Sequence, residues 1–375
     1  MFDLIFGKKT FVGLDIGTSS IKIVELKLID GKPTLSNYAW MPLGEGMQGK
    51  GDINSEYFYA VLPRLLKKIF KKSKIGKGNV YVSLPAFGGL ITLIDFPDMA
   101  VNDMEQAIKF EAHKYIPTSL DEVVISWDIV GKKEQIADNN ASAKEADADA
   151  RQIKNKNILQ VLLVAASKEK VLKYENLIKN SGLSLSSISL EPFPMVRSLV
   201  GNDPGNFVIV DIGSEVCNIM LVEKGIIMVN RNIDAGGGDI TKTIAKSMGV
   251  DNARAEQLKV SERNFFKGNS IINFFALELV IGEADRIIKT CLRDDAKMKI
   301  DGVILSGGTA EMTGICEYFS DKLKVRTTVG NPFNKVKYDN NLEKIISSVR
   351  TKYSVCVGLA LSGMEEYIKN KDNNK

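Results

Sequence analysis

The chain has 375 residues, of which 44% are hydrophobic and 26% are charged, so it can fold compactly and is too long for one ordinary core. Its net charge of +4 is too balanced to indicate nucleic-acid binding, and no apolar run is long enough to cross a bilayer. The four cysteines lie far apart without metal-site spacing, and no signal peptide is present, which indicates reduced thiols in a cytoplasmic protein.

The first predicted element is a β-hairpin over residues 11–26, in which two apolar strands flank a short polar turn. Gly17 lets that turn adopt a positive φ and bring backbone N–H groups close to an anion. Hydroxyl groups that can also donate to a phosphate follow it, on Thr18, Ser19 and Ser20. Asp15 ends the strand before the turn, where a phosphate would repel it unless Mg²⁺ lay between them.

A helix is predicted over residues 57–72, where apolar residues recur with helical spacing. Its other side and the following loop carry a basic run with no acidic residue, made of Arg64, Lys67, Lys68, Lys71, Lys72, Lys74 and Lys77. Such a run is usually a solvated face. The alternative is contact with anionic lipid or with an acidic protein surface.

Residues 79–190 are predicted to form a small α/β subdomain inserted into the first lobe. It combines strands with a helix from Asn102 to Tyr115, and it contains a charged excursion without hydrophobic periodicity at 132–157. The only histidine, His113, lies on that helix. A single histidine excludes a histidine zinc cluster, and it excludes a serine-histidine triad unless His113 is the histidine of that triad.

Residues 207–222 repeat the first hairpin without a gap. Asp211 stands where Asp15 stands, and Gly213 and Ser214 take the places of the first turn's glycine and threonine. A single Asp-Ile-Gly sequence is more often an ordinary hairpin turn, but two copies in register favour a duplicated phosphate-binding fold. Facing each other, the two turns would hold a triphosphate, with Mg²⁺ between its phosphates and the carboxylates of Asp15 and Asp211.

Two further glycine turns follow in the second lobe. Gly237 and Gly238 begin a helix whose N-terminus can attract an anion, although three consecutive glycines also permit close packing. Gly307, Gly308 and Thr309 follow a buried-strand pattern. Both turns are therefore candidates for contact with a nucleotide.

Three helices complete the second lobe. One begins at Asn252, the expected cap, and carries Glu256 and Lys259 on one face, where pairing of the two side chains is the simplest explanation. A long apolar helix covers about 271–293, and a helix with small residues covers 353–367. The predicted division is a first lobe of 1–78 plus 340–375, the insert 79–190, and a second lobe of 191–339.

As an ordered set, these motifs resemble the actin-like ATPase superfamily, which includes actin, DnaK-type chaperones, sugar kinases and FtsA. Residues 15–19 resemble its first phosphate motif, 211–214 its second, 306–309 its adenosine motif, and 255–259 the segment that contacts ribose and adenine in FtsA and MreB. The resemblance implies a two-lobed α/β fold of duplicated ribonuclease-H-like domains that binds ATP and Mg²⁺. It implies metal binding by Asp15 and Asp211, and nucleotide binding by Gly17, Thr18, Ser19, Ser20, Lys22, Gly213, Ser214, Gly237, Gly238, Glu256, Lys259, Gly307, Gly308 and Thr309.

Within the superfamily, residues 8–22, the insert with Phe110, Glu111 and 115–117, and residues 190–192 closely resemble the PilM family of type IV pilus assembly proteins. The resemblance implies a cytoplasmic, ATP-binding scaffold that is peripheral at the inner membrane. It would hold the N-terminal tail of the bitopic membrane protein PilN in a groove beside the insert and contact other pilus assembly proteins, with self-association as a further option.

Two other functions belong to the same superfamily. A small-molecule kinase of the same superfamily would need an aspartate base in the cleft, and none is evident beyond Asp15 and Asp211. An FtsA-like filament anchor would need a terminal amphipathic helix, whereas residues 365–375 are too polar to insert. We expect at most slow ATPase activity, with Glu191 as the candidate water-orienting residue and Glu215 beside the second turn opposing efficient hydrolysis.

Overall fold

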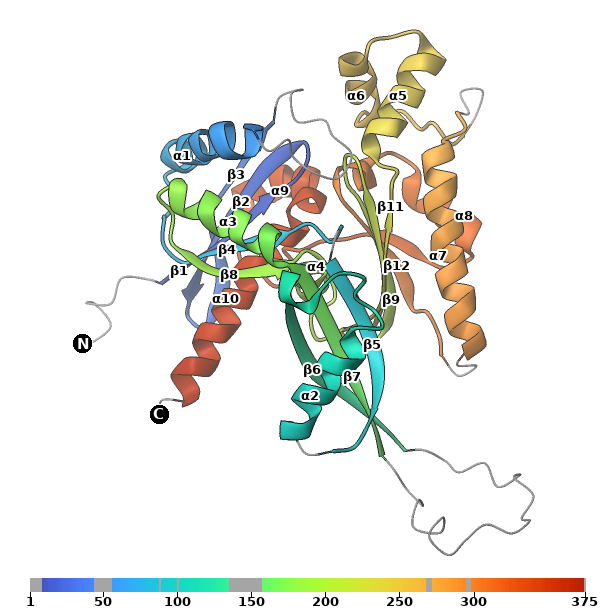
Figure 1. Ribbon diagram of the computed structural model, residues 1–375. Helices are drawn as coiled ribbons and strands as arrows, with labels where there is room; N and C mark the ends of the chain where they lie inside the picture. The colour runs from blue at the N-terminus through green and yellow to red at the C-terminus, as the bar shows by residue number, and fades with distance from the viewer. Residues whose placement is uncertain are drawn as a thin grey trace, which may run out of the picture. The chain divides into compact units, whose positions relative to one another are not determined.

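The computed structural model describes residues 9–43, 56–87, 89–99, 101–134, 157–267, 272–294 and 298–373 (Figure 1). The chain packs into two units. The first combines Met1–Phe87 with Val171–Lys375, and the second is Gly88–Lys170. Most of the charged excursion predicted at 132–157 lies outside the described residues.

A five-stranded sheet forms one half of the first unit, in the order β3-β2-β1-β4-β8. Its strands are β1 (Thr10–Ile16), β2 (Ser20–Ile29), β3 (Lys32–Pro42), β4 (Val80–Leu84) and β8 (Leu185–Leu190). The first three are antiparallel, and β4 and β8 continue the sheet parallel to β1. Central strand β1 is buried at nearly every position, because other parts of the lobe cover both of its faces.

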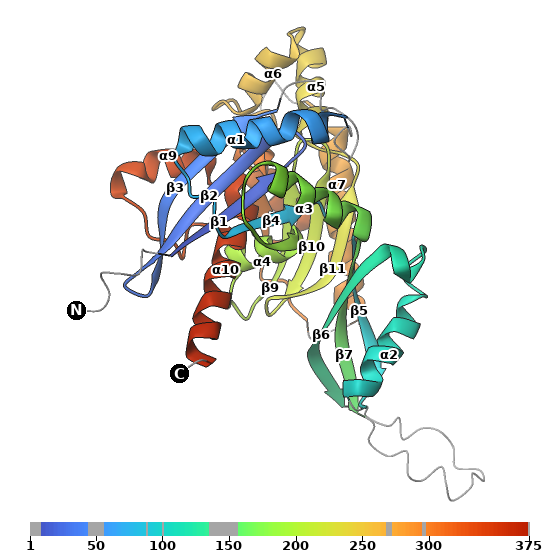
Figure 2. The ribbon, with the colours of Figure 1, turned by 60° about the vertical axis from the view of Figure 1, so that its left-hand side comes forward.

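A second sheet repeats this arrangement in the order β11-β10-β9-β12-β13. Its strands are β9 (Asn206–Ile212), β10 (Cys217–Glu223), β11 (Ile226–Ile233), β12 (Gly302–Ser306) and β13 (Thr327–Val329). The strand directions also match those of the first sheet: β10 is antiparallel to both β11 and β9, and β12 and β13 continue the sheet parallel to β9. The sequence duplication therefore corresponds to two lobes with the same topology, as predicted (Figures 1 and 2).

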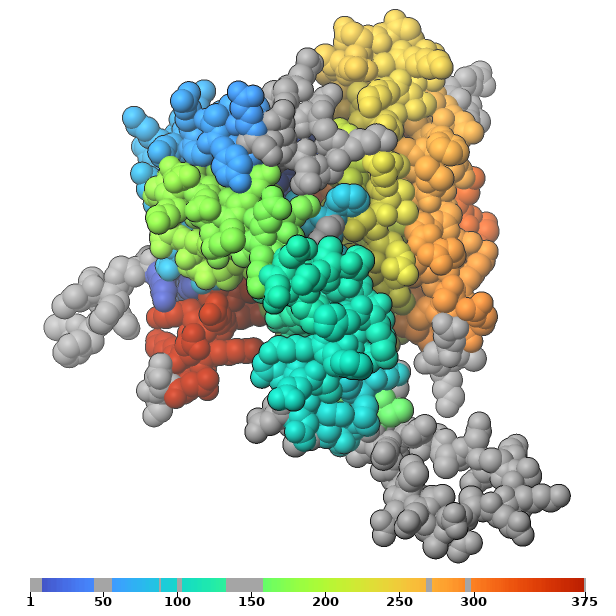
Figure 3. Space-filling model, in the orientation of Figure 1, coloured from blue at the N-terminus to red at the C-terminus, as the bar shows by residue number. Residues whose placement is uncertain are grey.

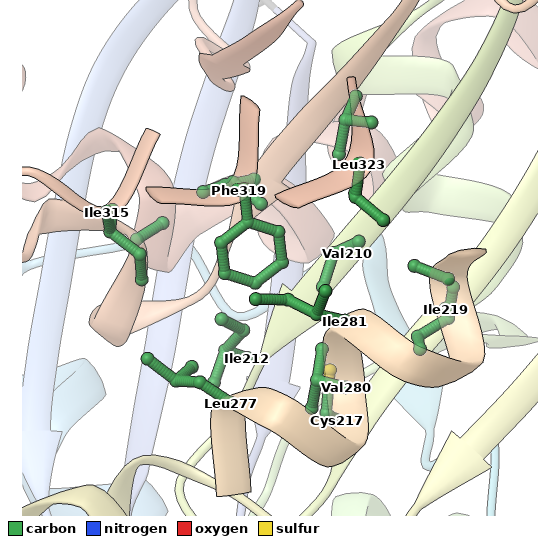
Figure 4. Packing of buried hydrophobic residues seen from close by; sticks show 14 of the residues in the cluster. Val210, Ile212, Cys217, Ile219, Leu277, Val280, Ile281, Ile315, Phe319 and Leu323 are labelled. Carbon is green, nitrogen blue, oxygen red and sulfur yellow. The ribbon is translucent and has the colours of Figure 1, made fainter. Parts of the chain in front are cut away.

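Helices pack on the second sheet, and an apolar core lies between them and the sheet. The helices of this lobe are α5 (Gly237–Met248), α6 (Asn252–Lys259), α7 (Phe275–Asp294) and α8 (Ile315–Leu323). Figure 4 shows Phe319 of α8 between side chains of α7 and of strand β9, such as Ile281 and Val210. The residue that caps α6 is Asp251, whose side chain accepts from Arg254 N at 2.7 Å, and Asn252 is the first helical residue.

Two helices join the lobes, α4 (Pro192–Leu199) and α10 (Ser354–Asn373). They touch at the backbone, because a Cβ atom at Gly358 would lie 1.8 Å from the carbonyl oxygen of Pro194. Helix α10 also meets β1 at the backbone, where a Cβ atom at Gly13 would lie 1.9 Å from the carbonyl oxygen of Cys356. Ser198 Oγ donates to the carbonyl oxygen of Ser354 at 2.7 Å and fixes this crossing.

Three more helices lie on the first lobe. The chain enters α1 (Leu62–Ser73) through a π-helical turn at Tyr57–Val61, and α1 packs on β3. Helix α3 (Lys168–Asn180) precedes β8, and α9 (Glu343–Val349) precedes α10. Tyr174 of α3 packs on Phe58 with ring centroids 5.3 Å apart, so α3 lies next to the start of α1 (Figures 2 and 3).

The second unit is a three-stranded antiparallel sheet with one helix. Strands β5 (Gly89–Pro97), β7 (Asn157–Ser167) and β6 (Val123–Glu134) lie in that order, and α2 (Val101–Ala112) covers one face. The unit covers fewer residues than the insert expected at 79–190, because β4 and β8 belong to the first sheet. His113 follows α2 and is exposed.

None of the helices in the described ranges combines the length and apolar character that a membrane span requires.

Candidate nucleotide site

Asp15 lies at the end of β1 with a cation directly across the hairpin. In the strand register it pairs with Lys22 of β2, and Lys22 Nζ lies 2.9 Å from Asp15 Oδ2. Ser83 Oγ, on parallel strand β4, donates to Asp15 Oδ1 at 3.1 Å. Although burial opposes its charge, Lys22 has a pKa well above its usual range because Asp15 and, more weakly, Asp211 stabilise the ammonium group.

Asp211 has the equivalent position in the second lobe but no cation across its hairpin. Its register partner is Asn218, which occupies the place that Lys22 has in the first lobe. Ser306 of β12, the counterpart of Ser83, donates a hydrogen bond to Asp211. Burial raises the pKa of Asp211 to about 6, against the opposing effects of Lys22 and Ser306. The two hairpins thus share a backbone design and differ in charge.

Glu191 connects the two aspartates electrostatically. It lies between β8 and α4, and its Oε2 accepts from Ala86 N at 3.3 Å and from Asn218 Nδ2 at 3.5 Å. Burial first, and then the charges of Asp15 and Asp211, raise the pKa of Glu191 to about 8. Three carboxyl groups from both lobes therefore face one lysine.

The donor set fits a magnesium ion that keeps most of its water. Among the residues that the structure describes, no three His, Cys, Asp or Glu side chains lie close enough to hold a metal by themselves. Mg²⁺ usually takes one or two carboxylates and completes its shell with water and phosphate oxygens. The buried Oδ1 of Asn218 has no hydrogen-bond partner among the described residues and could receive a bond from such a water. Oxygen donors from Asp15 and Asp211 match that preference.

The two polar turns close with the same backbone bond, because Gly213 N donates to Val216 O at 3.1 Å as Gly17 N does to Ser20 O, and they differ in their contact with α5. In the first, Gly17 N donates to Ser20 O at 3.1 Å, Ser20 is buried as the first residue of β2, and Ser19 is exposed. In the second, Gly213 and Ser214 use their carbonyl oxygens to accept from the N–H groups of Gly237 and Gly238, each at 2.8 Å. Those N–H groups are thus occupied by the fold, and the glycines serve close packing between the second turn and α5.

A polar cluster lies where α5, α6 and the third glycine turn meet. Lys259 is buried, and its Nζ lies 2.6 Å from Glu256 Oε2 and donates to Gly237 O at 3.1 Å and to Thr241 Oγ1 at 2.9 Å. Burial lowers the pKa of Lys259 despite the attraction of Glu256. The structure confirms the predicted Glu256–Lys259 pair and extends it to the start of α5.

The third glycine turn borders this cluster. Gly307 has a φ of +82°, and a Cβ atom there would lie 2.3 Å from the carbonyl oxygen of Ile212. A Cβ atom at Gly237 would lie 2.6 Å from Thr309 Oγ1, so Thr309 reaches the same place. A further charged residue, Glu215, approaches the first turn of α5, because a Cβ atom at Gly238 would lie 3.6 Å from its Oε1.

Comparison with known proteins assigns the chain to a family. Residues 13–364 match the protein family described as type IV pilus assembly protein PilM. The chain belongs to the PilM family. It is also 21% identical to the cell division protein FtsA of Bacillus subtilis (strain 168), over 86% of this chain and 78% of that protein. FtsA of Streptococcus pneumoniae serotype 2 is likewise 21% identical, over 86% of this chain and 75% of that protein.

Solved structures share the fold of the chain. A PilM-PilN type IV pilus biogenesis complex matches with a TM-score of 0.73 and 23% identity, covering 95% of this chain and 99% of the other. The ethanolamine utilization protein EutJ of Carboxydothermus hydrogenoformans matches with a TM-score of 0.53 and 16% identity, covering 95% and 90%. The predicted two-lobed actin-like fold is therefore confirmed.

Three residues of this PilM-family site were not predicted from the sequence. Ser83 and Asn218 contact the acidic groups, and Lys352 lies beside Gly308, where an added Cβ atom would be 3.6 Å from its Cε. The charge of Lys352 also contributes to the lowered pKa of Lys259. Alignment of the two hairpins could have identified Asn218 as the counterpart of Lys22. Nothing in the local sequence distinguishes Ser83 or Lys352.

The raised acid pKa values predict that the nucleotide-free protein loses stability as the pH rises. Between about pH 5 and pH 8 the folded chain retains protons on Asp211 and Glu191 that the unfolded chain has released, so the free energy of unfolding falls with increasing pH. The pKa of Lys22 lies above this window and adds no slope. We expect Glu191→Gln to be more stable than wild type at pH 8 by at least about 1 kcal/mol.

Urea unfolding at the two ends of this window tests the prediction. The stability difference between Glu191→Gln and wild type should be smaller near pH 5, where both carry a neutral side chain at residue 191. A wild-type stability that increases with pH across the window would contradict it.

Proposed function

We propose that this PilM-family protein is a nucleotide-gated scaffold of the type IV pilus assembly platform. The observation that carries the proposal is the joint acidic cluster, in which Asp15 of the first lobe and Glu191 at the start of connecting helix α4 interact electrostatically with Asp211 of the second lobe. A ligand that neutralises both sides favours the closed arrangement of the lobes by its differential affinity for that state. Mg²⁺ bound to ATP would supply the cation that these carboxylates need, and the phosphates would supply its remaining oxygen ligands.

Different groups of residues would contact the metal ion, the phosphates and the adenosine of the nucleotide. Asp15 and Asp211 would hold Mg²⁺ through water, and the polar groups around the two hairpin turns would surround the phosphates, namely Gly17, Thr18, Ser19, Ser20, Lys22, Gly213 and Ser214. The adenosine would lie along the polar cluster of Gly237, Gly238, Glu256, Lys259, Gly307, Gly308 and Thr309, with Lys352 added. Hydrolysis would be slow, with Glu191 orienting water.

The proposed partner is the N-terminal cytoplasmic tail of a PilN-like membrane protein, which would keep the chain peripheral at the inner membrane. A pocket of about 550 Å³ on the first unit suits an extended peptide, and it is lined by Lys9, Tyr81, Gly363, Glu366, Tyr367, Asn370 and Lys371. Lys9 Nζ lies 4.1 Å from the ring centroid of Tyr367. Aromatic walls with charges of both signs can bind apolar and charged side chains of one peptide.

Helix α10 provides a physical link between the two sites. At its start, Ser354 Oγ lies 2.9 Å from Ser306 Oγ, and Ser306 donates to Asp211. Toward its end, five residues of α10 line the pocket, namely Gly363, Glu366, Tyr367, Asn370 and Lys371. A shift of α10 on lobe closure would therefore alter the pocket, which is the proposed origin of nucleotide sensitivity.

Calorimetric titration with a synthetic PilN-like tail peptide, with and without Mg-ATP, tests this function. We expect saturable binding whose affinity changes with nucleotide. Lys371→Glu should weaken it by about tenfold, whereas Lys369→Glu, an exposed residue of the same helix outside the pocket, should not. Absence of peptide binding in both conditions would reject the partner. Equal binding by Lys371→Glu and wild type would reject the pocket while leaving the partner in place.

A further inference from the structure

Helix α1 separates its residues cleanly into an apolar and a basic side. Leu62, Leu66, Ile69 and Phe70 are buried. The basic face consists of exposed residues on the opposite side and just beyond the helix end, namely Arg64, Lys67, Lys68, Lys71, Lys72, Lys74 and Lys77. The sequence has no acidic residue between Glu56 and Asp95.

The stability of the helix does not account for this charge. Lys71 and Lys72 lie in the last turn, where a cation interacts favourably with the helix dipole, but Arg64 lies in the first turn, where it does not. Like charges four residues apart, as in Lys67 and Lys71, destabilise a helix. Within the described residues, no member of the basic face forms an ion pair, whereas other exposed lysines, such as Lys109 and Lys289, pair with a carboxylate on their own helix.

Exposed apolar groups adjoin the basic face. Tyr59, in the turn that leads into α1, is 55% exposed, and Leu172 of neighbouring α3 is 56% exposed. Lys173 Nζ lies 4.4 Å from the ring centroid of Phe58 and 5.9 Å from that of Tyr59. Figures 2 and 3 show α1 and α3 next to each other on the surface of the first unit. Basic residues beside an exposed aromatic ring and an exposed aliphatic side chain are typical of surfaces that contact lipid headgroups.

We propose that the basic face of α1 binds the anionic surface of a phospholipid bilayer. A helix of this length carries its charges along roughly 18 Å, on a convex strip that a fluid array of headgroups can match without a complementary groove. The preference for a membrane over an acidic protein rests on the proposed function, because a scaffold bound to a membrane-anchored partner lies near the bilayer. This contact would be made by the chain itself, in addition to its partner.

Vesicle co-sedimentation of the full chain tests the proposal without any partner peptide. The probe is phosphatidylcholine vesicles with about 30 mol% phosphatidylglycerol, compared with vesicles of phosphatidylcholine alone. The test variant is Lys67→Glu with Lys71→Glu. The matched control is Lys246→Glu with Lys344→Glu, two exposed helical lysines without an ion-pair partner in the described part of the chain, which changes the net charge equally.

We expect binding to the anionic vesicles alone, weakened at least about tenfold by the test variant, unchanged by the control, and lost at high salt, which screens exposed charges. Equal binding by both variants, absence of wild-type binding, or binding to an acidic protein in place of vesicles would overturn the proposal. Titration of the tail peptide into the same variants separates the two ideas, because its binding should survive loss of the basic face.

Discussion

Gly358→Ala is expected to destabilise the first unit by about 3 kcal/mol or more in the free energy of unfolding. The reason is steric, since the new methyl group would lie 1.8 Å from the oxygen and 2.4 Å from the carbonyl carbon of Pro194. Both groups are backbone and cannot rotate away. Relief would require α10 to move off α4, and the contacts of α10 with β1, β2 and β4 oppose that movement.

Gly282→Ala is the matched control for this prediction. Gly282 also lies inside a 20-residue helix, α7, but a Cβ atom there meets nothing within 4 Å. Alanine should therefore stabilise the protein by up to about 1 kcal/mol, through its higher helix propensity. Urea unfolding of both variants provides the comparison. A Gly358→Ala protein within about 0.5 kcal/mol of wild type would show that the helix crossing is less tight than the structure indicates.

Asp211→Ala is expected to reduce Mg-ATP affinity by at least about a hundredfold while the fold survives. Burial already disfavours the charge of Asp211 in the nucleotide-free protein, so its removal should leave the melting temperature unchanged or higher. Asp15→Ala should reduce affinity similarly, but it should also lower the melting temperature because it removes the 2.9 Å partner of Lys22.

Calorimetric titration with Mg-ATP and thermal unfolding without nucleotide measure the two effects separately. Asp321→Ala, an exposed aspartate on α8, serves as the control and should match wild type in both. Undiminished nucleotide affinity in both site variants would reject the metal role of the aspartates. Loss of affinity with equal melting temperatures would retain that role and reject the structural importance of the Asp15–Lys22 pair.

Local chemistry was enough to predict the two hairpins. Their aspartates and glycines recur in register, and the structure places each pair at the end of a central strand. Pairing between distant strands was not predictable in the same way. Strands β4 and β8 are found in the first sheet because β4 pairs with β1 and β8 with β4, contacts over long sequence separations that no local pattern specifies. The predicted insert of 79–190 therefore includes both strands by mistake.

The charge balance of the site also depended on three-dimensional neighbours. The sequence indicates Glu191 only as a candidate water-orienting residue, whereas its raised pKa arises from burial and from two aspartates distant in the sequence. Lys352 is an ordinary lysine in the sequence and becomes part of the site only through the position of the short helical turn that carries it. Residues identified by motif were thus found more readily than those brought in by packing.

The difference between Lys22 and Asn218 would decide how the proposed nucleotide enters. Two walls with the same strand order and equal charges would accept an elongated ligand equally well in either orientation. Here one wall carries a lysine across from its aspartate and the other a neutral amide, while the buried Lys259 and its neighbours belong to the second lobe alone. The energies of the two orientations would therefore be unequal, and a molecule with a charged tail and a flat aromatic head would have a single preferred direction of insertion.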